Sequence, residues 1–482
     1  MGAERGGEYR PASTLPAPAG VALASSMIRD TAVGLRFARS WLSGRADVAV
    51  REIVVDRGDR SVPATLLLPA RPGRAPLPGW ILLHGAAVPG RAHPQLVRFA
   101  KSLAHTGVAV LLPEVPEWKA LQLAPELTVP TVRASVPALH AVSTVAQGPV
   151  GLVGFSFGAP HAVAAGGDPS LAGALGGIAA FGGYVDLPRM LRFLFLGEHE
   201  WEGRRMRSEP DPYGRWIVGG NYLHRTPGYE DAEDVARALL ALATEAGVLG
   251  APSLDPVYDP TKRRLAEGIA PARRALFDLF APTDGRAPER ASVVALLPPL
   301  EAAIRRLDPA LDPVERLRRV RVPVRLMHGH GDVLIPYTET LRMGAAMGPD
   351  ADVGVTIRPG VALPRDSESA AFATPMSRSS ATTMRVGSGT RYTKRAPVEC
   401  SSPSSRTIRT RAGEGDTSPS ASADQPPYAA RIRSRIAGES VANVVSTPST
   451  GRRTTCASLI GRRPGLRGCA SWAIWSVGRG GR

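Results

Sequence analysis

Cysteine is absent from the first 360 residues, because the three cysteines of the chain are Cys400, Cys456 and Cys469. This absence excludes a disulfide framework and thiol chemistry from that part of the protein. Long hydrophobic runs are also missing, since none approaches the ~20 apolar residues that a membrane-spanning helix requires. The N-terminus has only a short apolar stretch around Val21, which is a poor match to a signal peptide. We therefore expect a cytoplasmic protein without a membrane partner.

Positive charge is concentrated in the last quarter of the chain. Of the net charge of +16, residues 361–482 contribute +12, from 19 Lys and Arg against 7 Asp and Glu. Such a tail would bind nucleic-acid phosphates without sequence preference. Its arginines, however, are not interleaved with aromatic residues as they are on a base-stacking surface. A basic-tailed nucleic-acid binder is therefore the least favoured function, and no specific nucleic-acid partner is expected.

Short apolar runs alternate with segments of helical spacing between residues 47 and 185. The runs 48–56 and 61–70 are separated by the polar sequence RGDR, which predicts a hairpin. Later runs are continuously apolar, which is typical of strands buried on both faces of a parallel sheet. The alternation predicts an α/β fold with a doubly wound, mostly parallel sheet. Ligands of such sheets bind at the carboxyl ends of the strands.

An inserted cap is expected to interrupt this core. Residues 186–320 are mainly helical in pattern, and the strand–helix alternation resumes only over 321–360. Aromatic residues are dense between Phe193 and Tyr222, which favours either an apolar group on the substrate or packing within the cap. The spacing of apolar residues in the cap predicts helices over 232–246, 262–280 and 300–307.

The two ends of the chain lack this order. Residues 1–46 are expected to form an N-terminal arm and a leading helix, partly disordered, with Met1 or Met27 as the natural start. Residues 361–482 are rich in Ser, Thr, Arg and Pro and have no sustained period of 2 or 3.6 residues. This composition predicts a disordered tail.

A glycine-flanked serine follows one of the apolar strands. The sequence GFSFG, from Gly154 to Gly158, matches the nucleophile elbow G-x-S-x-G with Ser156 at its centre. In that motif a sharp strand-to-helix turn exposes the serine, and the glycines avoid clashes with neighbouring backbone. The helix that follows directs its free N–H groups toward the reacting oxygen.

Two further motifs lie at expected strand ends, LHGAA at 83–87 and MHGHGDVLIP at 327–336. With the elbow between them, they make the chain resemble the α/β-hydrolase superfamily over residues 48–360, and more loosely its serine esterases and dienelactone hydrolases. The resemblance implies that Ser156 is the nucleophile and that Asp332 is the acid. It also implies that the backbone N–H groups of Ala86 and Phe157 form the oxyanion hole. Asp186 is a competing acid, at a position that some members of the superfamily use.

The chain departs from this pattern at the histidine. In the family the order is serine, acid, histidine, and the histidine follows the last strand in a PG-x-x-H-like turn. Here the turn begins with Pro359 and Gly360, but residue 363 is leucine and the last histidine of the chain is His330. Because composition also changes at this point, we expect a reading-frame shift near residues 360–366, with an off-frame tail beyond it. Sequencing the gene across codons 350 to 370 would test this hypothesis.

Five other histidines are candidate replacement bases, because a serine hydroxyl needs a general base to act as a nucleophile. His84 adjoins the oxyanion turn and is expected to be structural. His328 and His330 are expected at a strand end and in a loop, and His161 within the helix after the elbow. His224 lies in the expected cap and is left open.

The resemblance implies a serine hydrolase that cleaves a small-molecule carboxylic ester, thioester or lactone, impaired in this chain by the missing histidine. The alternative is a non-catalytic pseudoenzyme of the same fold. The sequence has no metal-ligand cluster, dinucleotide-binding fingerprint or P-loop, so no cofactor and no metal are expected. It does not indicate the oligomeric state.

Overall fold

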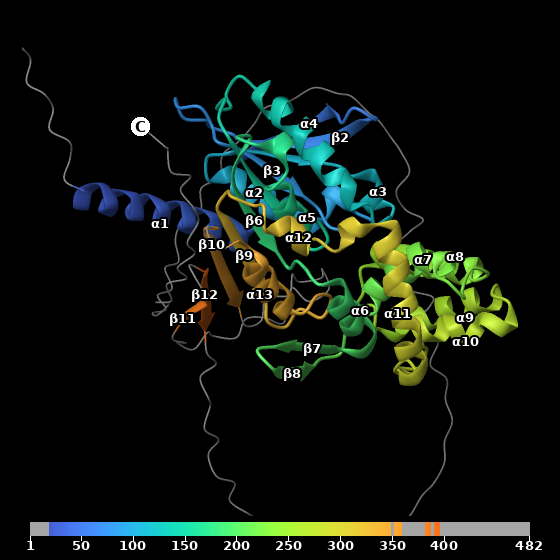
Figure 1. The fold of residues 1–482 in the computed structure, drawn as a ribbon. Helices are drawn as coiled ribbons and strands as arrows, with labels where there is room; N and C mark the ends of the chain where they lie inside the picture. Colours follow the sequence, from blue (N-terminus) through green and yellow to red (C-terminus); the bar gives the residue numbers. More distant parts are fainter. Residues whose placement is uncertain (1–18, 349–350, 359–380, 387–389, 396–482) are drawn as a thin grey trace, which may run out of the picture. The chain divides into compact units, whose positions relative to one another are not determined.

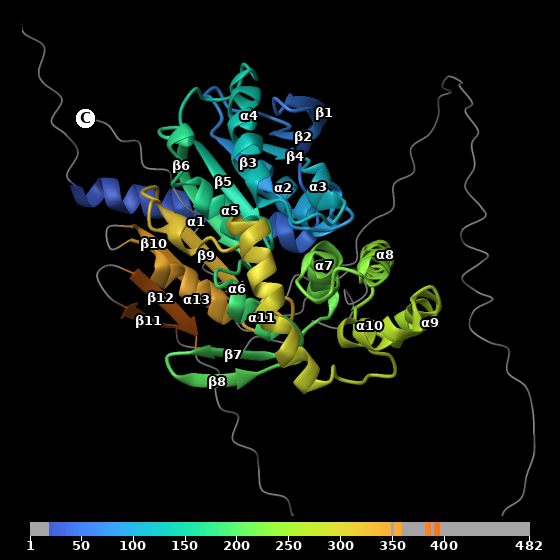
Figure 2. The ribbon, with the colours of Figure 1, turned by 45° about the vertical axis from the view of Figure 1, so that its right-hand side comes forward.

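A single mixed sheet organises the chain. The computed structural model describes residues 19–348, 351–358, 381–386 and 390–395. Within these residues, ten strands follow the order β1–β2–β4–β3–β5–β6–β9–β10–β12–β11 (Figures 1 and 2). Strands β2 and β11 run antiparallel to their neighbours and the other pairs are parallel, which confirms the predicted fold class. The strands are β1 (Val48–Asp56), β2 (Ser61–Pro69), β3 (Gly79–Leu83), β4 (Ala109–Pro113), β5 (Val150–Phe155), β6 (Leu175–Phe181), β9 (Val324–Gly329), β10 (Val353–Arg358), β11 (Ala381–Val386) and β12 (Thr390–Arg395).

Helices cover both faces of the sheet. Successive side chains of a strand point to opposite faces, so Leu82 packs with α1 and α2, whereas Ile81 and Leu83 pack with α4 and α5. The side chains of Ile81, Leu82 and Leu83 are all fully buried, as their continuous apolar run predicts. The helices of the core are α1 (Ala19–Ser43), α2 (Pro94–His105), α3 (Pro116–Lys119), α4 (Thr128–His140), α5 (Gly158–Ala165) and α13 (Tyr337–Ala346).

The direction of strand winding reverses between β3 and β5. From β3 the chain passes to β4 on one side and later crosses to β5 on the other side. Where the direction of winding changes in this way, the loops after the two strands separate and leave room for a ligand. The HG turn follows β3 and the elbow follows β5, so both motifs lie at this point of the sheet.

A mainly helical segment, residues 187–317, connects β6 to β9 and is called the insert below. Its helices α7 to α10 pack together beside α11 (Figure 2). The sequence predicts one helix over 262–280, but the structure has two, because Gly268 ends the first and Pro271 begins a separate turn. The elements are α6 (Leu187–Leu196), β7 (Glu198–Trp201), β8 (Arg204–Arg207), α7 (Tyr213–Tyr222), α8 (Glu233–Leu249), α9 (Asp259–Glu267), α10 (Arg274–Phe280), α11 (Arg290–Leu307) and α12 (Val314–Leu317).

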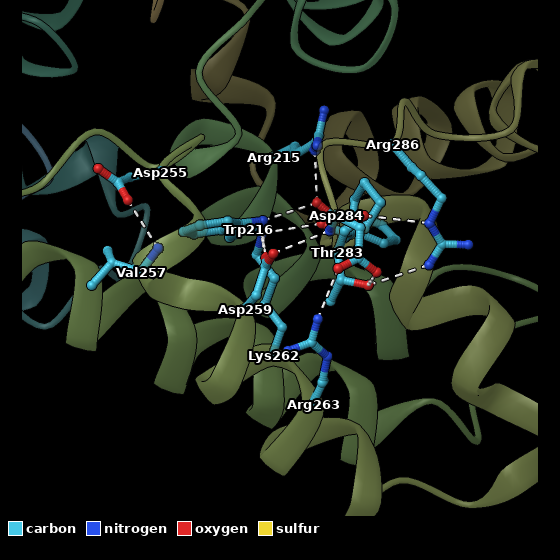
Figure 3. A network of polar contacts seen from close by, with 12 residues as sticks. Arg215, Trp216, Asp255, Val257, Asp259, Lys262, Arg263, Thr283, Asp284 and Arg286 are labelled. Carbon is cyan, nitrogen blue, oxygen red and sulfur yellow. Dashed lines mark hydrogen bonds and ion pairs between the residues drawn. The ribbon is translucent and has the colours of Figure 1, made fainter. Parts of the chain in front are cut away.

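Figure 3 shows a network of paired polar groups inside the insert. The carbonyl oxygen of Phe280 accepts hydrogen bonds from Arg215 Nε (2.7 Å) and Trp216 Nε1 (2.9 Å). The buried Lys262 ammonium lies 3.0 Å from Asp259 Oδ1 and 3.0 Å from the carbonyl oxygen of Pro282. Buried polar groups must find such partners, and these contacts join α7, α9 and the end of α10.

Most aromatic side chains of the insert are buried. Phe193, Phe195, Trp216 and Tyr222 are each at most 3% exposed and belong to the main hydrophobic core. Their burial favours the packing interpretation of this aromatic segment over a role in contacting substrate.

The segment 361–482 is described only at β11 and β12. The sequence predicts no regular element there, whereas the structure has two strands that extend the sheet beyond β10. Their sequences, ATTMRV and TRYTKR, contain the threonine, valine and tyrosine that strands favour. The rest of the segment, including Leu363 and the expected frame shift at 360–366, lies outside the described residues.

Candidate active site

Ser156 occupies a strained turn between β5 and α5. Its φ is +52°, a left-handed value that non-glycine residues rarely adopt and that is concentrated at functional sites. The Ser156 N–H donates to the carbonyl oxygen of Phe181 at the end of β6 (2.8 Å), and Ala159 N–H donates back to Ser156 O (3.0 Å). These two bonds hold the turn against the sheet on one side and the helix on the other.

The elbow glycines are required by close backbone contacts. A Cβ at Gly154 would lie 2.5 Å from the carbonyl oxygen of Gly158, and a Cβ at Gly158 would lie 2.5 Å from the carbonyl oxygen of His84. Gly85 is similarly constrained, because its Cβ would lie 3.0 Å from Ser156 Cβ. The structure therefore brings the HG turn into direct contact with the elbow.

Two backbone donors beside Ser156 are open. Ala86 follows the HG turn, and Phe157 is the N-cap residue of α5, with N–H groups that α-helices leave unsatisfied. In the described part of the chain, neither N–H donates to a protein acceptor. Their role as the oxyanion hole stays a prediction.

His84 and Trp118 are buried residues that pack beneath the HG turn and the elbow. His84 Nδ1 lies 2.7 Å from Gly85 O, and because a carbonyl oxygen only accepts, Nδ1–H is the donor. The Trp118 ring is fully buried and packs edge-on against His84 and Phe157, with centroid distances of 5.7 and 5.2 Å. His84 is thus held inside the core, as its expected structural role requires.

The Asp332 carboxylate lies at the carboxyl ends of β6 and β9. Oδ1 accepts hydrogen bonds from the N–H groups of Leu334 (2.8 Å) and Ile335 (3.1 Å). Oδ2 is 3.3 Å from His328 Nε2 and 3.5 Å from the position of a Cβ at Gly182. The loop therefore orients the carboxylate rigidly and leaves about a quarter of the side chain exposed (23%).

Asp186, the competing acid, is engaged elsewhere. It is the N-cap of α6, where Oδ1 accepts from Arg189 N–H (3.1 Å) and Oδ2 pairs with Arg189 Nε (3.2 Å). A carboxylate at this position stabilises a helix start. Asp186 therefore has a structural role at the start of α6.

No histidine of the described residues hydrogen-bonds to Ser156. His328 is buried, with Nδ1 2.6 Å from Thr340 Oγ1 and Nε2 2.9 Å from the carbonyl oxygen of Ile335. His161 is buried in α5, where burial lowers its pKa to about 3, and it pairs with the Tyr184 hydroxyl (3.2 Å).

The remaining two candidates are His330, in the loop after β9, and His224, within the insert. His330 is exposed and stacks on Tyr337, with ring centroids 4.4 Å apart. His224 lies in a 3-10 turn after α7, and its Nδ1 has no hydrogen-bond partner among the described residues. The sequence argument omitted His199 of β7, whose ring contacts Phe193 and Tyr337. Its pKa is lowered, first by burial and then by the charge of His330.

The insert touches the loops around the site. The Asp211 N–H donates to the carbonyl oxygen of Val333 (2.8 Å), next to the acid. Gly247 of α8 lies against Val88, in the loop that follows the HG turn, since a Cβ at Gly247 would be 2.6 Å from a Val88 methyl. The insert is therefore fixed to the core beside both Asp332 and the HG turn.

Glu339 is a buried carboxylate that the sequence gives no reason to select. Its Oε2 accepts the N–H groups of Val185 (3.0 Å) and Asp186 (2.9 Å) and so ties α13 to the start of the insert. Burial raises the pKa of Glu339 to about 7, although these two N–H groups and Arg342 oppose the shift.

We expect the Glu339 carboxyl to make the free energy of unfolding fall as pH rises. The folded protein holds a proton that the unfolded chain releases near pH 4.5, so between about pH 4.5 and 7 folding is progressively disfavoured. In Glu339→Gln, which stays neutral, this part of the pH dependence should vanish. Urea unfolding at several pH values should show the difference between wild type and variant changing by about 3 kcal/mol across the window. Parallel curves for the two proteins would contradict the assignment.

Within the described residues, no group of three or more His, Cys, Asp and Glu side chains is arranged to hold a metal ion. In the same residues, no helix is both long and apolar enough to cross a membrane.

No family model matches the sequence, and no curated protein matches it. Several solved structures match the structure of this chain. Pyrococcus horikoshii acylaminoacyl peptidase is 13% identical, with a TM-score of 0.35 over 65% of this chain and 37% of its own. A 2,6-dihydroxy-pseudo-oxynicotine hydrolase is 16% identical, with a TM-score of 0.34 over 64% and 60%. Est1E from Butyrivibrio proteoclasticus is 12% identical, with a TM-score of 0.34 over 64% and 88%.

This chain spans 37% of the length of the peptidase that it matches. At these identities and TM-scores, the likeness carries no argument about activity. In this chain the HG turn follows β3, the strained serine follows β5 and the carboxylate follows β9. The chain has a doubly wound, mostly parallel α/β fold.

Proposed function

We propose that the chain is a serine hydrolase that acts on a small-molecule carboxylic ester, thioester or lactone. The observation that carries this proposal is Ser156 itself, a non-glycine residue at φ +52° with Gly85 packed against it. Strain of this kind persists only where the surrounding structure enforces it. The position of the serine beside two open N–H groups is what acyl transfer requires.

In the proposed reaction, Ser156 Oγ attacks the substrate carbonyl carbon. The electron pair of the C=O bond moves to its oxygen, and the N–H groups of Ala86 and Phe157 stabilise that oxyanion. The C–O or C–S bond to the leaving group then breaks, and water later releases the acyl group from the serine. Asp332 would orient the histidine that transfers protons in these steps. Because this chain has no histidine at the position the family uses, both steps are expected to be slow.

A non-catalytic pseudoenzyme is the second candidate. The observation that favours it is that no histidine of the described residues reaches Ser156 by a hydrogen bond. The two candidates differ in whether the serine reacts at all.

Covalent labelling tests the proposal. Purified full-length protein is expected to react with a fluorophosphonate at Ser156 and to hydrolyse p-nitrophenyl acetate slowly, because an oxyanion hole alone retains part of the catalysis. Ser156→Ala should abolish both reactions, whereas Ser170→Ala, at an exposed serine, should change neither. Mass spectrometry locates the label. A wild-type protein that takes up no label would favour the pseudoenzyme, and labelling that survives Ser156→Ala would refute the nucleophile.

A further inference from the structure

The direction of the Ala86 N–H depends on the peptide unit that precedes it. In a trans peptide the C=O and the following N–H point in opposite directions and rotate as one rigid plane. His84 Nδ1–H binds Gly85 O at 2.7 Å on the buried side of the turn. This bond therefore aims the Ala86 N–H away from the core. The direction of the Ala86 N–H therefore depends on how firmly the His84 imidazole is held.

Glu114 fixes that imidazole and the far end of the same turn. Its Oε1 lies 3.0 Å from His84 Nε2, an ion pair when the imidazole is protonated, and accepts the backbone N–H of Arg91 at 3.1 Å. The Val115 N–H also lies 3.0 Å from His84 Nε2 and donates to it when the ring is neutral. The side chain is 5% exposed, so these contacts form away from water. One carboxylate oxygen thus holds residue 84 and residue 91 together, with the oxyanion turn between them.

The backbone between these two residues is shaped around the carboxylate. Gly90 has a φ of +54°, and a Cβ there would lie 2.2 Å from Glu114 Oε1. Only glycine leaves room for the oxygen to reach the Arg91 N–H. The carboxylate comes from the end of β4, the strand beside β3, so the sheet itself sets its place.

We propose that Glu114 is a positioning residue of the oxyanion hole, which clamps both ends of the turn 84–91 and so directs the Ala86 N–H at the substrate oxyanion. This inference rests on the proposed function, because an oxyanion must form at Ser156 for the clamp to matter.

The charge state of Glu114 suits this role. Burial alone would raise its pKa, but the hydrogen bond and charge of His84, the Arg91 N–H and the Lys119 ammonium together leave that pKa below its ordinary value. Lys119 Nζ lies 3.7 Å from Oε2 and reaches the carboxylate from the exposed side. The clamp is therefore ionised at neutral pH, and charge-assisted hydrogen bonds are the stronger kind.

A boronic acid tests the clamp without needing turnover. Phenylboronic acid adds to a serine hydroxyl: a B–O bond forms, the hydroxyl proton leaves to solvent, and boron becomes a tetrahedral anion with an oxygen in the oxyanion hole. Its affinity for the full-length protein, measured by calorimetry, reports the hole, and the ¹¹B NMR shift of the tetrahedral adduct identifies the bound state. If Glu114 had only a structural role, its replacement would lower thermal stability but would change neither the boronate affinity nor the ¹¹B NMR shift.

Glu114→Gln is expected to weaken the binding of phenylboronic acid about tenfold or more, because small misplacements of an oxyanion donor are costly. The matched control is Glu117→Gln. Glu117 comes from the same segment and pairs with Arg57 Nη2 (2.9 Å), but within the described residues it makes no hydrogen bond or ion pair with the turn 84–91. Its loss should leave the affinity unchanged to within about twofold.

His84→Gln gives a second measurement, which holds even if Glu114→Gln does not fold. It removes the bond to Gly85 O and is expected to weaken boronate binding to a similar extent. The double variant should lose little more than either single variant, because both act through one contact chain.

Different outcomes separate the clamp from the proposed function. No boronate adduct in wild type, or an adduct that persists in Ser156→Ala, would refute the nucleophile and the clamp with it. A wild-type adduct that depends on Ser156 but keeps its affinity in folded Glu114→Gln or His84→Gln would refute the clamp alone.

Discussion

Leu363→His is expected to raise the rate of p-nitrophenyl acetate hydrolysis by about 100-fold, because a positioned general base contributes at least this much to acyl transfer. Residue 363 has the spacing of the family histidine, because it lies three positions after Gly360, with two residues between. The described structure supports the location up to the end of β10. There, Arg358 is paired with Gly329, three residues before Asp332. The chain therefore leaves β10 at the edge of the sheet where the acid lies.

The gain should depend on both the serine and the new imidazole. Leu363→Ala controls for loss of the leucine and is expected to leave the rate at the wild-type level. Leu363→His combined with Ser156→Ala should return to the background rate, and combined with Asp332→Asn it should lose most of the gain, since the acid fixes the tautomer. Initial rates over pH 6 to 9 measure all of these. A Leu363→His protein no faster than Leu363→Ala would mean that replacing this single residue does not restore the base.

The parts of the site that the sequence predicts are those with a local signature. Ser156 is found because two glycines and an apolar strand accompany it within a few residues. Asp332 is found because its loop has a fixed spacing from the preceding strand. In both cases the structure shows a physical reason for the pattern: glycines at backbone contacts of 2.5 Å, and two N–H groups that only a short loop can direct at one carboxylate.

Glu114 has no such signature, because its partners come from other strands. His84 is 30 positions earlier in the sequence, and the two meet only because β3 and β4 are neighbours. The one available signal is an acidic residue at the end of a continuously apolar strand, beside the strand that carries the HG turn. Glu339 is hidden for the same reason, since its partners Val185 and Asp186 lie more than 150 residues away.

Local signals were present for two features of the insert that periodicity overlooks. Glu202 and Gly203, the turn between β7 and β8, both have positive φ (+49° and +75°), which is the two-residue turn that strand hairpins favour. Gly268 and Pro271 interrupt the segment 262–280, where the apolar spacing alone predicts an unbroken helix. In both places turn chemistry outweighs the spacing of apolar residues.

Gly158→Ala is expected to lower the free energy of unfolding by about 3 kcal/mol and to abolish labelling of Ser156. The added Cβ would lie 2.5 Å from the carbonyl oxygen of His84, which is backbone and cannot rotate away. Overpacking in a close-packed interior costs about 1–3 kcal/mol even where side chains can adjust. Here the relief must come from separating the elbow from the HG turn. That separation moves Ala86 away from Ser156 and so removes the geometry on which the reaction depends.

Gly148→Ala is the matched control, because a Cβ there meets no atom within 4 Å and Gly148 does not have a positive φ. Urea unfolding of this variant should stay within about 1 kcal/mol of wild type, since adding a methyl group to a compatible glycine mainly restricts the unfolded chain. Fluorophosphonate labelling should also be retained. If Gly158→Ala unfolded like wild type and still labelled at the wild-type rate, the elbow and the HG turn could separate without consequence. The direct contact between them would then not be what holds the two oxyanion donors in place.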